Sequence, residues 1–157
     1  LGMAPNDEPG RLWATQLQLT IADLVTEVHD THHPIASSMY YKDQKPEALR
    51  RAANFTAERL PRFLDYFESI LERNPHGINY MVGDALSYVD LSMFQIIAGL
   101  RYAFPRTMKK LEPDYARLIG LHDRVASRPR IKAYLASARR VPFSKEGIFR
   151  HYTELDT

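Results

Sequence analysis

The sequence contains no cysteine among its 157 residues. Disulfide bonds, cysteine-ligated metal sites and cysteine nucleophiles are therefore excluded within it. The absence of cysteine also agrees with a reducing compartment, and we expect a cytoplasmic protein. No run of residues approaches the roughly 20 apolar residues that a membrane-spanning helix needs, and no signal peptide is visible.

An excess of one charge is also absent. The sequence has 21 Lys and Arg residues against 19 Asp and Glu residues, which gives a net charge of +2 and a pI near 8.9. The basic residues are scattered, and no run is dense enough to form a nucleic-acid footprint. We therefore expect neither a nucleic acid nor a membrane as a partner.

Strand-like alternation is missing beyond three or four residues, whereas helical periodicity runs through most of the sequence. These patterns predict an all-α bundle of five or six helices in one domain. We expect a short linker over residues 1–6, a helical domain over 7–157 and a surface tail over 141–157. Because the sequence opens with Leu1 and not with Met, we also expect it to be part of a longer polypeptide.

The most informative segment is the capping box formed by Ser87 and Asp90. A serine and an acid three residues apart can each accept a hydrogen bond from the other residue's backbone N–H, which starts a helix. The helix that follows is apolar on nearly every side, which is typical of a helix buried inside a bundle, and Pro105 should end it. We assign Asp90 a structural role and expect the Asp90→Ala substitution to lower stability by about 1–2 kcal/mol.

Two long helices are predicted before this one. The first begins near Asp7, ends near Pro34 and carries an apolar stripe that follows the helical period: Trp13, Leu17, Ile21, Leu24 and Val28. A second helix, from Pro46 to Asn74, should bend at Pro61. Its predicted inner face is Leu49, Ala53, Leu60, Leu64, Phe67 and Leu71. Residues 106–112 are expected to form a loop.

Two motifs resemble the C-terminal domain of the cytosolic glutathione S-transferases. One is residues 81–91, Met-Val-Gly-Asp-Ala-Leu-Ser-Tyr-Val-Asp-Leu, and the other is residues 124–137, which begin Arg-Val-Ala-Ser-Arg-Pro. The resemblance covers nearly the whole sequence and is nearest to the alpha, mu, pi and sigma classes. It implies a homodimeric transferase that conjugates glutathione, its co-substrate, to hydrophobic electrophiles in detoxification.

Family members carry a thioredoxin-like domain that holds glutathione as a thiolate, and this sequence shows no such βαβ pattern. We therefore expect no catalytic residue on this chain and no activity from it in isolation, because the thiol must be ionised to react. The resemblance also leaves a second interpretation open. Similar domains serve as non-catalytic interaction modules, and the same pocket would suit a ligand carrier.

The resemblance implies a role for Asp23 on the first helix. Several classes have an aspartate there that reaches across the dimer to the α-amino group of glutathione bound to the other subunit. A carboxylate facing an ammonium group is a sound pairing. The alternative is that Asp23 belongs to a solvated polar stripe with Gln16, Thr20, Glu27 and Asp30.

His29, Asp30, His32 and His33 form the densest polar cluster in the sequence. His29 and His33 have metal-ligand spacing, but the glutamate of an H-E-x-x-H motif is missing and no third ligand is evident, so we expect no metal. The resemblance instead implies that Thr26, Asp30 and His33 line the electrophile pocket. A third interpretation is a helix C-terminus stabilised by positive histidines.

Aromatic residues near the end of the sequence complete the predicted site. Phe149 and Tyr152 would cover the electrophile pocket from the tail. Anchoring the tail to the bundle is an equally good explanation for them. Spacing gives no Ser-His-Asp arrangement, no glycine-rich phosphate loop and no pair of catalytic carboxylates.

Overall fold

The structure is a computed structural model that describes residues 2–157. Within that range it holds seven α-helices and no strand: α1 (Glu8–Asp30), α2 (Lys45–Asn54), α3 (Leu60–Arg73), α4 (Tyr88–Ala103), α5 (Pro105–Leu111), α6 (Ala116–Ser127) and α7 (Pro129–Leu135). A π-helical turn, Phe55–Arg59, joins α2 to α3 without a break, so these two form one rod. The prediction of an all-α bundle is confirmed. None of the helices in the described range is long and apolar enough to cross a membrane.

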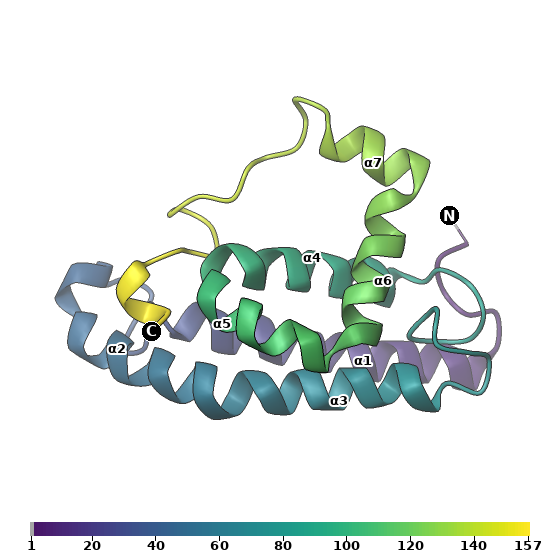
Figure 1. Ribbon diagram of the computed structural model, residues 1–157, viewed down its shortest axis with the longest axis horizontal. Helices are drawn as coiled ribbons and strands as arrows, with labels where there is room; N and C mark the ends of the chain where they lie inside the picture. The colour runs from purple at the N-terminus through teal and green to yellow at the C-terminus, as the bar shows by residue number, and fades with distance from the viewer. Residues whose placement is uncertain (1) are drawn as a thin grey trace.

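Figure 1 shows α1 and α3 lying side by side, with α4 and α5 on top of them. Helix α6 packs against α3 and α4 and leads to α7, which projects from the bundle. After α7, residues 136–152 pass back over α4 as an extended segment, called the return segment below. The chain ends in a short 3-10 turn, Thr153–Leu155, beside α2. The return segment therefore forms part of the surface around α4.

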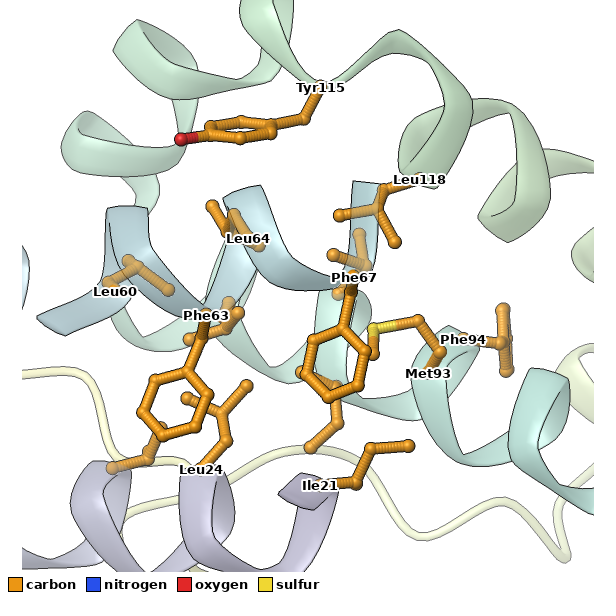
Figure 2. Close-up of a cluster of buried hydrophobic side chains, with 14 of the residues drawn as sticks. Ile21, Leu24, Leu60, Phe63, Leu64, Phe67, Met93, Phe94, Tyr115 and Leu118 are labelled. Carbon is orange, nitrogen blue, oxygen red and sulfur yellow. The ribbon is translucent and has the colours of Figure 1, made fainter. Parts of the chain in front are cut away.

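Helix α4 is the central element, as its apolar sequence predicts. Its side chains meet those of α1, α3 and α6 in one core, part of which is shown in Figure 2. The large apolar residues of this helix that are at most 3% exposed are Val89, Met93, Ile96, Ile97 and Leu100. The stripe on α1 is buried as predicted except for Trp13, which is 36% exposed, and Ala14 occupies the buried position beside it.

The predicted inner face of the second helix is wrong upstream of the π-helical turn. Leu49 and Ala53 are exposed, whereas Ala48, Ala52 and Phe55 are fully buried. A π turn inserts one extra residue into the helix, so the buried face upstream shifts by one position relative to the face of α3. Pro61 lies in the first turn of α3, immediately after the π turn, where its missing N–H is tolerated.

The predicted loop over residues 106–112 is wrong. Pro105 ends α4 but also occupies the first position of α5, where its fixed φ favours a helix. The backbone N–H groups of Arg106 and Thr107 donate hydrogen bonds to the carboxylate of Asp156, which is fully buried. Asp156 lies about 50 residues further along the chain, so no local pattern revealed this helix.

Candidate functional site

An apolar groove of about 760 Å³ runs between α1, α4 and the return segment. Helix α1 contributes Gln18, Ile21 and Val25, and α4 contributes Leu91, Ser92, Gln95 and Ile96. The third wall comes from residues of the return segment between Val141 and Phe149. A mostly apolar concave surface with a few polar groups is typical of a small-molecule site.

Two details shape this groove. The Oε1 atom of Gln18 is buried and accepts no hydrogen bond within the described chain, so the wall of the groove holds an unused acceptor. Phe149 lies directly on Gly99 of α4, where an added Cβ would come within 2.5 Å of the phenyl ring. Glycine at this position therefore lets the return segment approach α4 closely.

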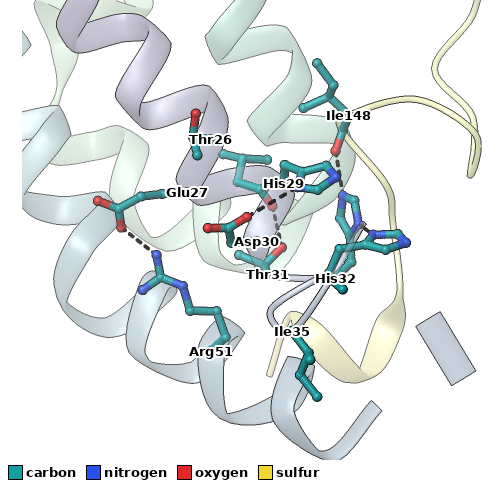
Figure 3. A network of polar contacts seen from close by, with 12 residues as sticks. Thr26, Glu27, His29, Asp30, Thr31, His32, Ile35, Arg51 and Ile148 are labelled. Atoms are coloured by element: carbon teal, nitrogen blue, oxygen red, sulfur yellow. Dashed lines mark hydrogen bonds and ion pairs between the residues drawn. The ribbon is translucent and has the colours of Figure 1, made fainter. Parts of the chain in front are cut away.

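Three histidines meet where α1 ends, close to the groove. The ring centroids of His29, His32 and His33 lie 4.8–5.2 Å from one another. Figure 3 shows His32 facing the carbonyl of Ile148, to which its Nε2 atom donates a hydrogen bond of 2.8 Å. His29 Nδ1 lies 3.3 Å from the carboxylate of Asp30. This cluster joins α1 to the return segment that forms one wall of the groove.

Burial controls the protonation of these rings. It lowers the pKa of His32 to about 4, and the nearby charge of Arg150 acts in the same direction, although the bond to Ile148 opposes the shift. Burial and Arg150 also lower the pKa of His33. Both rings are therefore neutral at pH 7, and their Nδ1 atoms share a hydrogen bond of 2.5 Å. The interpretation of the cluster as positive histidines at a helix end does not fit His32 and His33.

The residues predicted to line the pocket divide into separate groups. Phe149 lines the groove, and His33 lies in the adjoining histidine cluster with Asp30 beside it. Thr26 is exposed and donates back to the Ala22 carbonyl. Tyr152 stacks on Tyr41 with a centroid separation of 3.9 Å. The five predicted residues therefore do not converge on one cavity.

Asp23 lies on a different face of α1. It is exposed, one helical turn from Thr20 on one side and from Glu27 on the other. Thr20 borders a shallow cleft of about 320 Å³ with Arg59, Arg62, Phe63 and Tyr66 of the α2–α3 rod. Asp23 is thus exposed one helical turn from a residue of this cleft, and it does not line the groove.

Sequence reasoning missed three contributors to the groove and the cluster. His32 was recognised as part of a polar cluster but not as the third imidazole, although spacings of three and four residues place side chains on one helical face. Gln18 and Ile148 gave no signal, because their roles depend on how the return segment lies over α1 and α4.

Comparison with known proteins gives one family. A model described as "Glutathione S-transferase, C-terminal domain" matches residues 29–138. A glutathione S-transferase of Plasmodium yoelii yoelii is 27% identical over 113 residues, which cover 71% of this chain and 47% of that protein. Glutathione S-transferase P of Bos taurus is 31% identical over 125 residues, covering 78% of this chain and 54% of the relative.

Solved structures show the same fold. The Pi-class glutathione S-transferase of Onchocerca volvulus superposes with a TM-score of 0.65 at 21% identity, covering 85% of this chain and 56% of that one. The chain spans about half the length of the curated relatives it matches. Since the family model covers well over half of the sequence, the chain belongs to the glutathione S-transferase C-terminal domain family.

Proposed function

We propose that this chain is the helical domain of a glutathione transferase and that its groove binds the hydrophobic electrophile. The observation that carries this proposal is the groove itself, an apolar cavity of about 760 Å³ between α1, α4 and the return segment, in a member of this family. The chemistry needs a glutathione thiolate, which attacks the electrophilic atom of the second substrate while that substrate's leaving group departs or its double bond takes up a proton. The thiolate would be generated by a part of the protein that the relatives carry outside the matched region.

Within this scheme the groove's role is to hold an apolar molecule and orient it. Ile21, Val25 and Ile96 supply apolar contact with the bound molecule. Asp23, exposed on the opposite side of α1, would act in a homodimer by pairing with the ammonium group of glutathione bound to the partner. The two substrates would then depend on different faces of one helix.

The test uses the full-length protein in a glutathione-conjugation assay with an aryl halide as the electrophile. Gln95→Trp places a large side chain in the groove from an exposed position on α4. We expect it to raise the KM for the electrophile roughly tenfold while the KM for glutathione stays unchanged. Lys109→Trp, at an exposed position on α5, is the matched control.

Asp23→Asn tests the role of the α1 face that lies opposite the groove. It should raise the KM for glutathione roughly tenfold and leave the KM for the electrophile unchanged, with the exposed Asp43→Asn as its control. Conjugation that is insensitive to both Gln95→Trp and Asp23→Asn would refute these assignments. Binding of apolar ligands without any conjugation would instead favour the ligand-carrier function.

A further inference from the structure

The three histidines at the end of α1 have the composition and placement of a metal site. Each ring offers one nitrogen, and these three atoms lie within 4.8 Å of one another. His32 and His33 are 1% and 8% exposed, so solvent reaches the cluster mainly at His29. Three imidazoles are a common ligand set for zinc and for neighbouring late first-row ions.

Hydrogen bonds orient two of the rings for this purpose. His32 donates its Nε2–H to the Ile148 carbonyl, which leaves the lone pair on Nδ1, where it accepts a hydrogen bond of 2.5 Å from Nδ1 of His33. An ion would take the place of this hydrogen bond. His29 Nδ1 faces the Asp30 carboxylate, and donation there leaves the lone pair on Nε2. Metal-binding histidines almost always donate their second N–H to a carbonyl or a carboxylate in this way, which fixes the tautomer and the ring orientation.

The spacing of the rings is compatible with a single ion. Zinc–nitrogen bonds of about 2.0–2.1 Å in a tetrahedral site place the nitrogens about 3.4 Å apart. The Nδ1 atoms of His32 and His33 are 2.5 Å apart, and the widest separation between ligand atoms is within 4.8 Å. Small rotations of the rings would bring all three nitrogens to the required distance.

The charges around the cluster partly balance. The carboxylate of Asp30 favours a cation beside His29, whereas the guanidinium of Arg150 opposes one near His32 and His33. Arg150 is itself held to the return segment by a hydrogen bond from its Nε to the Gly147 carbonyl.

We propose that His29, His32 and His33 bind one late first-row divalent metal ion, with Zn²⁺ as the reference ion, at the junction of α1 and the return segment. A solvent molecule would complete the coordination, because the His29 side chain is 29% exposed. A bound ion would fix the rings that hold the Ile148 carbonyl and would thereby rigidify one wall of the groove. This site is independent of glutathione conjugation, so its test does not depend on enzyme activity.

The experiment uses the full-length protein, free of any histidine tag and stripped of metal with a chelator. Calorimetric titration with Zn²⁺ should give one tight site per chain, and Co²⁺ should develop the visible absorption bands of tetrahedral coordination. Zn²⁺ should also slow amide hydrogen exchange over residues 147–150, because Ile148 is tied to His32.

His29→Gln is the decisive variant, because His29 is partly exposed and its loss should leave the fold intact. We expect it to weaken Zn²⁺ binding at least tenfold, since one of three ligands is removed. His76→Gln, on an exposed turn after α3, is the matched control and should bind Zn²⁺ as the unmodified protein does. Equal Zn²⁺ affinity in the two variants, or only octahedral Co²⁺ spectra, would overturn the proposal.

Discussion

Asp90 and Asp156 are two fully buried carboxylates near the starts of two different helices. Each accepts hydrogen bonds from two backbone N–H groups and one side-chain hydroxyl. Asp90 accepts from the backbone N–H groups of Met81 and Ser87 and from the Ser87 hydroxyl, at 2.6–2.7 Å. Asp156 accepts from the backbone N–H groups of Arg106 and Thr107 and from the Thr107 hydroxyl, at 2.6–2.9 Å.

The difference between them is distance along the chain. The bond from Ser87 to Asp90 spans three residues and forms as soon as α4 begins, whereas those to Asp156 span 49 and 50 residues. The first therefore stabilises α4 from within. The second exists only when the return segment has crossed the bundle, so it makes the order of α5 depend on the order of the chain's end.

Asp90→Ala should have the largest effect on stability. It removes the acceptor for two buried backbone N–H groups, one of them in a different segment from the capping box, so we expect a loss of about 3 kcal/mol in the free energy of unfolding. That exceeds the estimate from the capping box alone, because the contact with Met81 was not foreseen. Chemical denaturation measures the loss, with the exposed Asp84→Ala as the control. A loss below about 1 kcal/mol would contradict the buried network.

Asp156→Ala tests the distant counterpart. We expect a smaller loss, about 2 kcal/mol, because the return segment and α5 can loosen together while the central helix stays packed. Hydrogen exchange should quicken over residues 105–111 and 149–157 and stay slow over 88–103. The exposed Thr157→Ala provides the comparison. Uniform loss of protection across α4 would show that the two carboxylates support one cooperative unit.

Glu68 is an intermediate case, because it caps α6 from α3. Its carboxylate accepts from the N–H groups of Arg117 and Leu118 at 3.0 and 2.9 Å, and from the Arg117 guanidinium at 3.2 Å. Glu68→Ala should lower the free energy of unfolding by about 1.5 kcal/mol. Glu72→Ala removes a more exposed contact with the same arginine and should cost less than about 0.5 kcal/mol. Equal losses in the two variants would mean that the ion pair and not the cap matters.

These cases show which parts of the structure the sequence could reveal. The helical periods and the Ser87–Asp90 spacing are local, so the central helix and its start were predicted correctly. The caps supplied by Glu68 and Asp156 are contacts between distant segments and leave no mark on local spacing. The π turn was missed for a related reason, since a single inserted residue shifts the buried face without changing the composition.

The candidate site was less accessible to sequence reasoning than the fold. His29 and His33 stood out by their spacing, but the groove exists only because the return segment crosses α4 and presses Phe149 onto Gly99. The resemblance to the glutathione S-transferases supplied residues on α1, and the structure distributes them over several surfaces. Thr26 and Tyr152 lie apart from the groove, whereas the resemblance implies that Thr26 lines the electrophile pocket and that Tyr152 covers it.

Replacing Glu27 should have the smallest effect on the free energy of unfolding, and it distinguishes the contribution of charge from that of hydrogen bonding. It joins α1 to the α2–α3 rod through Arg59, at 2.6 Å, and Arg51, at 3.2 Å. The hydrogen bond from Arg59, ahead of other influences, lowers the pKa of Glu27 below its usual value of 4.5. Burial instead raises the pKa of Asp90, despite its three hydrogen bonds. The two carboxylates should therefore respond to acid in opposite directions.

The pH dependence of the contribution of Glu27 to stability follows from proton binding. Below pH 4.5 the unfolded chain takes up a proton at Glu27 more readily than the folded protein does, so the contribution of Glu27 to stability is present above that pH and is lost as the pH falls through the folded pKa. Glu27→Gln should cost about 1 kcal/mol at pH 7 and progressively less below pH 4.5. Glu58→Gln, in an exposed pair with Arg62, should cost almost nothing at either pH. A cost for Glu27→Gln that does not change with pH would show that hydrogen-bond geometry and not charge holds α1 to the rod.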